Sequence, residues 1–228
     1  MIPLRDANPT RRTPVVTLGI IIACFAVFAW ELGLSASGGQ SALDAFITEW
    51  GVVPADLTAA WARGDYLSHQ TATLVTSQFL HGGWAHILFN MLYLWIFGKN
   101  VEDTLGHTRF TLFYLLSGVA AALTQVLASP ASGVPMIGAS GAVSGVLGAY
   151  LILFPQSRVL TLVIFGFFWR LVNIPAVVVL GFWIVLQILN GLGSFGDAGS
   201  VAWFAHIGGF FAGMLLLIVM RPRTLVRR

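Results

Sequence analysis

The sequence predicts an all-α polytopic membrane protein, on the basis of its composition and the grouping of its apolar residues. Of the 228 residues, 57% are hydrophobic and only 9% are charged, whereas a soluble domain carries about a quarter charged residues. The apolar residues are gathered into long segments, several of which approach the roughly 20 residues that a helix needs to cross a bilayer. The single cysteine, Cys24, lies within such a segment, which excludes a disulfide framework and a cysteine-based metal site.

Six apolar segments are predicted to span the membrane as helices. They cover residues 15–34, 83–98, 110–129, 139–154, 172–192 and 202–220. A further apolar stretch, 159–169, is too short to span and ends at Arg170. We interpret this stretch as an interfacial or connecting segment, with a tilted continuation of the fifth helix as the alternative.

The segments define one membrane domain, at residues 15–220, between two tails. The tails are an N-terminal one at 1–14 and a basic C-terminal one at 221–228. A long loop at 35–82 holds most of the acidic residues and is predicted to lie outside the membrane. Its scattered tryptophan, valine and leucine residues suggest short amphipathic pieces at the interface.

The basic residues predict the orientation of the chain. All but Arg63 fall on one side of a six-helix arrangement: Arg5, Arg11, Arg12, Lys99, Arg109, Arg158, Arg170, Arg221, Arg223, Arg227 and Arg228. Because basic loops stay inside, we expect both termini to be cytoplasmic, in a multi-pass protein of a prokaryotic cell (inner) membrane. The net charge of +3 is then topological, and no nucleic-acid partner is expected, because no basic cluster is interleaved with aromatic residues.

Polar side chains that hydrocarbon should reject lie at one common depth on three segments that run in the same direction. From His206 to Arg221 and from Ser140 to Pro155 the chain covers 15 residues, or roughly 22 Å of helix. His86 lies roughly 20 Å from the inner end of its own segment. We therefore predict that the serine and both histidines meet several ångströms below the outer surface.

Small residues accompany two of these polar groups. Gly141, Gly145 and Ala149 share one face of the fourth segment, and Gly209 and Gly213 share one face of the sixth. Such faces let two helix backbones approach closely. We expect this contact to bring the serine and the histidine within hydrogen-bond reach.

The fourth segment is too short to reach the outer surface, so the preceding stretch GVPMIGA, residues 133–139, must dip inward. Irregular backbone at such depth is tolerated where it is buried in protein or lines a watery cavity. We therefore predict a cavity that opens to the outside.

These residues could carry out nucleophilic catalysis. A serine hydroxyl needs a base to take its proton, and His206, in an apolar setting, is expected to be neutral as that role requires. No carboxylate lies at the matching depth, so we expect Ser140 as nucleophile and His206 as general base in a dyad. His86 and Asn90 share a helix face and, with the free N–H groups at the start of the fourth helix, could stabilise an oxyanion.

Each residue taken alone has a simpler interpretation. A serine among small residues is usually packing, an intramembrane histidine often marks a proton path, and an asparagine can join two helices. Gln187 and Asn190 on the fifth segment are interpreted as interhelical hydrogen bonders. The shared depth and the contact faces together favour catalysis.

Three motifs resemble, in order, the signatures of rhomboid intramembrane serine proteases: HGGWAHILFNMLYLWIFGKNVEDTLG, GASGAVSGVLGAY and AHIGGFFAGM. The resemblance runs from about residue 50 to the end of the chain. It implies a six-transmembrane-helix rhomboid-like bundle that cleaves transmembrane segments of other membrane proteins at a water-filled site. In this comparison Ser140 matches the nucleophile, His206 the base, and His86 and Asn90 the oxyanion side. Structural support is expected from Glu102 and from Gly138, Gly141, Gly145, Gly209 and Gly213.

The chain departs from the family pattern at two places. Some members carry an aromatic residue four positions after the nucleophile, stacked on the base, where this chain has Ser144. Some carry a Trp-Arg pair ahead of the first histidine, where this chain has Ala72 and Thr73. These departures affect how the base is oriented and how the first loop is anchored.

The leading hypothesis is therefore an intramembrane serine endopeptidase whose partners are substrate transmembrane segments and the lipid bilayer. The alternatives are a factor that binds transmembrane helices without cutting them and a small transporter that uses its histidines as a proton relay. No metal or organic cofactor is expected, because the two histidines of HGGWAH lie five residues apart and do not share a helix face well.

Overall fold

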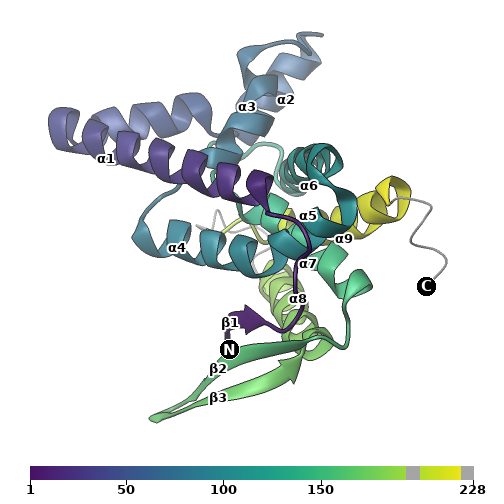
Figure 1. Ribbon diagram of the computed structural model, residues 1–228. Coiled ribbons are helices and arrows are strands. Elements are labelled where there is room, and N and C mark those ends of the chain that lie inside the picture. The colour runs from purple at the N-terminus through teal and green to yellow at the C-terminus, as the bar shows by residue number, and fades with distance from the viewer. Residues whose placement is uncertain (194–200, 222–228) are drawn as a thin grey trace.

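The computed structural model describes residues 1–193 and 201–221 and shows a mostly helical chain (Figure 1). In these residues four helices are long and apolar enough to cross a membrane: α1 (Val15–Trp50), α6 (His107–Ala128), α8 (Ala176–Gly193) and α9 (Trp203–Met220). A fifth apolar helix, α7 (Ser140–Leu153), is shorter. The last four correspond to the predicted segments 110–129, 172–192, 202–220 and 139–154.

The second predicted segment, 83–98, belongs to a longer helical run. It consists of α4 (Trp84–Tyr93), a π-helical turn η2 (Leu94–Gly98) and α5 (Lys99–Leu105). The run changes pitch at the π-helical turn, beside the first turn of α1, where Thr17 lies close to Gly98. It ends at Gly106, whose φ of 77° is a conformation that glycine adopts readily.

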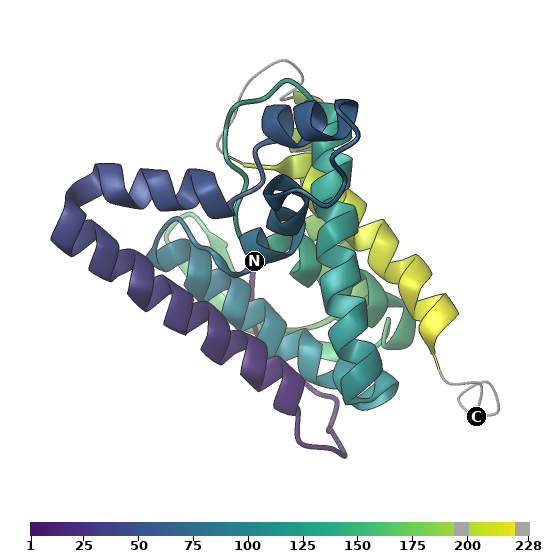
Figure 2. The same ribbon diagram turned by 90° about the horizontal axis from the view of Figure 1, so that it is seen from above.

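The first helix is longer than the predicted 15–34, and the predicted outer loop 35–82 is largely helical. The chain folds back within α1 at Gly39, where φ is 72° and ψ is −174°, and the second arm returns toward the other helices (Figure 2). Two short helices, α2 (Pro54–Ala62) and α3 (His69–Thr76), and a 3₁₀ turn η1 (Ser77–Phe79) follow. The sequence predicted short amphipathic pieces here but not their bounds, since most of the stability of short helices comes from packing against the bundle.

The expectation of an all-α fold is wrong in one region, which forms a small antiparallel sheet. Its strands are β1 (Ile2–Asp6), β2 (Arg158–Phe165) and β3 (Phe168–Pro175), in the order β1-β2-β3. The predicted interfacial stretch 159–169 forms most of a β2–β3 hairpin, and residues 172–175, predicted to begin the fifth span, belong to β3. Valine, isoleucine, threonine and aromatic residues favour strands, but an apolar run this short does not distinguish strand from helix.

The hairpin projects from the helices (Figure 1). Aromatic side chains near its tip are exposed. Phe167 is fully exposed, and its neighbours are also mostly exposed: Phe165, Phe168 and Trp169. The turn passes through Gly166, which has a φ of 57°.

A buried carboxylate joins the sheet to the helices. Asp6, at the end of β1, forms an ion pair with Lys99 Nζ at 2.8 Å. The same carboxylate accepts hydrogen bonds from Asn100 Nδ2 at 2.6 Å and from the Tyr150 hydroxyl at 3.1 Å. The N-terminal strand is thereby attached to α5 and α7.

Glu102, on α5, binds the start of α1. Its carboxylate accepts hydrogen bonds from the backbone N–H groups of Val16 at 2.9 Å and Thr17 at 2.8 Å, and from the Thr17 hydroxyl at 2.7 Å. His107 Nδ1 lies 2.7 Å from the same carboxylate. The first N–H groups of a helix have no partner within it, and a carboxylate there is favoured by the helix dipole.

Candidate active site

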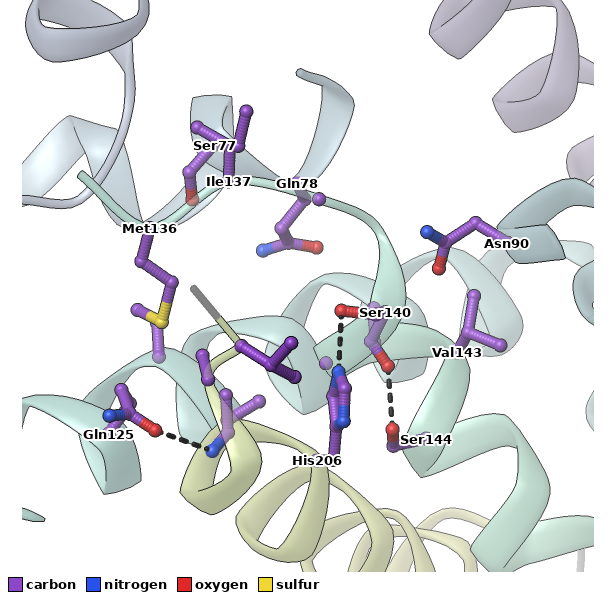
Figure 3. A pocket seen from close by; sticks show the side chains of 18 of the residues that line it. Ser77, Gln78, Asn90, Gln125, Met136, Ile137, Ser140, Val143, Ser144 and His206 are labelled. Carbon is purple, nitrogen blue, oxygen red and sulfur yellow. Dashed lines mark hydrogen bonds between the residues drawn. The ribbon is translucent and has the colours of Figure 1, made fainter. Parts of the chain in front are cut away.

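The structure places Ser140 and His206 in direct contact. Ser140 is the first residue of α7, and His206 lies in the first turn of α9. The two side chains point toward each other (Figure 3), with His206 Nε2 2.9 Å from Ser140 Oγ.

The contact between α7 and α9 depends on glycines. A Cβ atom added to Gly209 would collide with the backbone carbonyl oxygen of Gly141, and one added to Gly213 would collide with the backbone of Gly145. Any larger residue would push the helices apart, because backbone atoms cannot move aside as a flexible side chain can. The small residues thus allow the close approach of the helices that carry Ser140 and His206.

The second ring nitrogen of His206 also has a partner. Nδ1 lies 2.7 Å from Oε1 of Gln187 on α8. An amide oxygen only accepts hydrogen bonds, so Nδ1 carries the proton, and the neutral ring presents an unprotonated Nε2 to the Ser140 hydroxyl. Sequence reasoning predicted Gln187 as an interhelical hydrogen bonder but did not identify its partner.

Aromatic rings flank His206 even though position 144 is a serine. The ring of Trp183, on α8, lies 5.9 Å from that of His206, between centroids. The ring of Trp203, on α9, lies at 6.2 Å and nearly perpendicular. Ser144 instead donates a hydrogen bond to the backbone carbonyl of Ser140 at 2.6 Å. Two rings, one from α8 and one from α9, therefore flank the imidazole of His206.

His86 and Ser140 both lie close to Gly138. The backbone N–H of Gly82 donates to His86 Nδ1 at 3.3 Å, which leaves the proton of a neutral ring on Nε2. A Cβ atom added to Gly138 would lie 2.6 Å from this Nε2 and 3.7 Å from Ser140 Oγ. His86 therefore presents a hydrogen-bond donor toward the region next to the serine.

Asn90 is one turn after His86 on α4. Its Nδ2 donates to the backbone carbonyl of His86 at 2.9 Å, and an amide nitrogen carries a second proton. The side chain is buried and stands across the pocket from Ser140 (Figure 3). The predicted oxyanion residues thus line one pocket with the serine and the histidine.

This pocket has a volume of about 750 Å³. Besides the four polar residues, it is lined by the irregular stretch before α7, including Pro135, Met136 and Ile137, and by Gln78 of η1. Residues 134–138 of the stretch that was predicted to dip inward line this cavity. Hydrogen bonds from Gly138 N to Ser77 O and from Met136 N to Val52 O, both 2.8 Å, hold this stretch in place.

A buried carboxylate of α1 binds the backbone ahead of α4. Glu31 of α1 is buried and accepts hydrogen bonds from the backbone N–H of His81 at 3.2 and 3.3 Å. This contact fixes the turn that precedes α4, and therefore the placement of His86.

Comparison with known proteins gives consistent matches. A family model for the rhomboid domain matches residues 68–223. The chain is 36% identical over 145 residues to the rhomboid protease GluP of Bacillus subtilis, which covers 63% of this chain and 25% of GluP. It is 32% identical over 158 residues to the mitochondrial rhomboid protein 1 of Saccharomyces cerevisiae, covering 66% of this chain and 42% of that protein. It is 35% identical over 159 residues to RHOMBOID-like protein 1 of Arabidopsis thaliana, covering 68% of this chain and 36% of that protein. The matched region thus spans less than half the length of these relatives.

Proposed function

Since the chain belongs to the rhomboid family, we propose that it is an intramembrane serine endopeptidase that cleaves transmembrane segments of other membrane proteins. The observation that carries this proposal is the 2.9 Å contact between Ser140 Oγ and His206 Nε2 within a cavity of about 750 Å³. A hydroxyl bonded to the unprotonated nitrogen of an imidazole is the arrangement that an activated serine nucleophile requires.

In the proposed reaction, Ser140 Oγ attacks the carbonyl carbon of the scissile peptide bond while His206 Nε2 takes the hydroxyl proton. The tetrahedral intermediate collapses as the imidazolium returns this proton to the leaving amine, which gives an acyl-enzyme. A water molecule then attacks the ester, again with His206 as base, and releases the acid and free Ser140.

The negative oxygen of the intermediate would lie between three sources of donors. These are the Nε2–H of His86, the side-chain amide of Asn90 and the backbone N–H groups at the first turn of α7. Donors that are in place before charge develops stabilise the transition state without reorganisation. The hydrogen bonds from Gly82 to His86 Nδ1 and from Asn90 to His86 O support this assignment, because they fix both side chains.

We propose that substrates enter sideways between α4 and α8, since Phe89 and Tyr93 of α4 and Trp183 of α8 all line the cavity. An intact helix shields its own carbonyl groups, so a substrate must unwind near the scissile bond. Glycine and proline destabilise helices, and segments that contain them are the expected substrates.

The proposal includes a six-span architecture in which the run α4–η2–α5 acts as the second span and α7 as the fourth. Both termini would face the cytoplasm, as in a bacterial inner membrane. The orientation is supported by the distribution of basic residues. In this orientation the cavity would lie toward the outer side of the membrane, and the three-stranded sheet, which includes the N-terminal strand, would lie on the cytoplasmic side.

Labelling with a serine-reactive fluorophosphonate tests the proposal. We expect the purified wild-type protein to be labelled and to cleave a reconstituted single-span substrate, and both signals to be lost in Ser140→Ala and His206→Ala. Ser144→Ala is the matched control, because this hydroxyl lies one turn along α7 and bonds to a backbone carbonyl; it should remain labelled. A folded wild-type protein that stays unlabelled and binds the substrate without cutting it would instead be a binding factor.

A further inference from the structure

We infer that Gln187 is a positioning residue that fixes the tautomer of His206, so that α8 contributes the third member of an uncharged Ser140–His206–Gln187 arrangement. This inference rests on the proposed function. It identifies a role for a side chain that lies outside all three sequence motifs.

The amide of Gln187 is held with its oxygen toward the histidine. Oε1 lies 2.7 Å from His206 Nδ1, and Nε2 donates to the backbone carbonyl of Trp183 at 3.4 Å. If the amide were turned over, a donor would face Nδ1 and a carbonyl oxygen would face Trp183 O, so both contacts would become unfavourable. The side chain is 7% exposed, so water does not readily take the place of either partner.

The hydrogen bond has a direct chemical consequence. A neutral imidazole carries one proton, and the hydrogen bond at one nitrogen decides which nitrogen keeps it. With the proton held on Nδ1, the lone pair of Nε2 is available to Ser140. If Nδ1 had no acceptor, part of the population would carry the proton on Nε2 and could not act as base.

The glutamine reproduces one function of a catalytic-triad carboxylate and omits another. An acceptor at Nδ1 sets the tautomer and the ring orientation, whereas a carboxylate also stabilises the imidazolium that forms during the reaction. Trp183, one turn before Gln187 on the same face of α8, contacts the ring of His206 as well. Helix α8 therefore orients the base through two side chains.

The test compares substitutions at Gln187 with the same substitutions at Asn190. Asn190 is on α8, is exposed, and bonds to the backbone carbonyl of Leu186 at 2.8 Å. For Gln187→Met, which keeps the length but removes the acceptor, we expect kcat to fall about 10- to 100-fold, as when a metal-binding histidine loses the partner that orients it, with KM nearly unchanged. Asn190→Met should leave both constants close to those of the wild type.

The pH profile separates positioning from packing. For Gln187→Glu, we expect the acid limb of kcat/KM to move to higher pH and activity to recover above it. When the new carboxyl group is ionised, it favours the protonated imidazolium of His206, which cannot act as a base. When the carboxyl group is protonated, it can donate to Nδ1 and favour the tautomer with the proton on Nε2. Asn190→Asp should not move the acid limb. Equal shifts in the two acidic variants, or wild-type kcat in Gln187→Met, would overturn the inference.

A spectroscopic measurement keeps this inference separate from the proposed function. In protein labelled with ¹⁵N histidine, the signals missing from His206→Ala identify this ring. We expect the wild type to show a proton on Nδ1 and Gln187→Met to show a mixture of tautomers. An unchanged spectrum in Gln187→Met refutes the positioning role even if the enzyme is active, and a changed one supports it even if no substrate is cleaved.

Discussion

At the scale of single residues, the site depends on close approaches that only small side chains permit. Gly138 lies close to both His86 and Ser140, with a φ of 121° that residues with a Cβ atom rarely adopt. Sequence reasoning identified Ser140, His206, His86 and Asn90, because polar groups at one depth of a membrane protein are informative. It did not connect Gln187 to His206, because glutamine has no distinctive signal among apolar neighbours and the contact joins separate helices.

Gly138→Ala should reduce kcat by about 100-fold or more, comparable to the loss of an oxyanion donor. The new methyl group would lie 2.6 Å from His86 Nε2 and displace that donor. The measurement is kcat for a reconstituted substrate, with Gly133→Ala as the control, since a Cβ atom at Gly133 meets nothing within 4 Å. Similar kcat values for the two variants would contradict this reading of Gly138.

At the scale of elements, the apolar helices were predictable and the remainder was less so. The hydrophobic segments gave α6, α7 and α9 to within a few residues, because each helix is one continuous apolar run. The second arm of α1, beyond Gly39, was missed because Gln40, Asp44 and Glu49 interrupt its apolar residues. The β2–β3 hairpin was missed because its strands lack a polar face. The alternation that usually reveals a strand requires one side to face water.

Helix packing gives a stability prediction. Gly213→Ala should lower the free energy of unfolding by about 1–3 kcal/mol, as expected for an overpacked contact, because its Cβ atom would collide with the backbone of Gly145. Gly181→Ala, on α8, is the matched control: nothing lies within 4 Å of its Cβ position, and alanine stabilises a helix interior by up to about 1 kcal/mol. The melting temperatures of the two variants and the wild type are measured in the same detergent. Equal shifts in the two variants would show that the α7–α9 contact tolerates a methyl group.

At the scale of the whole molecule, the two ends of the bundle are built differently. The end near Ser140 holds the cavity, whereas the other end is closed by the sheet and by the buried Asp6, which ties the first strand to α5 and α7. Sequence patterns identify neither Asp6 nor its partners, since these groups are up to 144 residues apart along the chain. Such contacts become visible only when the complete fold is assembled.

Lys99→Met should lower the free energy of unfolding by about 3 kcal/mol, the lower end for a broken buried ion pair. The ammonium lies 2.8 Å from Asp6, whose side chain has no exposed surface, and Asn100 and Tyr150 continue to bond to it. The double variant Lys99→Met with Asp6→Asn leaves no unpaired charge and should recover part of this loss. Chemical denaturation of the single and double variants provides the comparison, and a double variant less stable than Lys99→Met would argue against charge burial as the cause.

The exposed hairpin tip has a practical consequence for handling the protein outside its native bilayer. A detergent belt just wide enough for the helical bundle would leave the rings of Phe165, Phe167, Phe168 and Trp169 in water, where apolar surfaces associate. Micelles of short-chain detergent should therefore give clumped particles, and lipid nanodiscs, which extend a bilayer around the whole circumference, should give dispersed ones. Samples for electron microscopy should therefore be prepared in lipid nanodiscs.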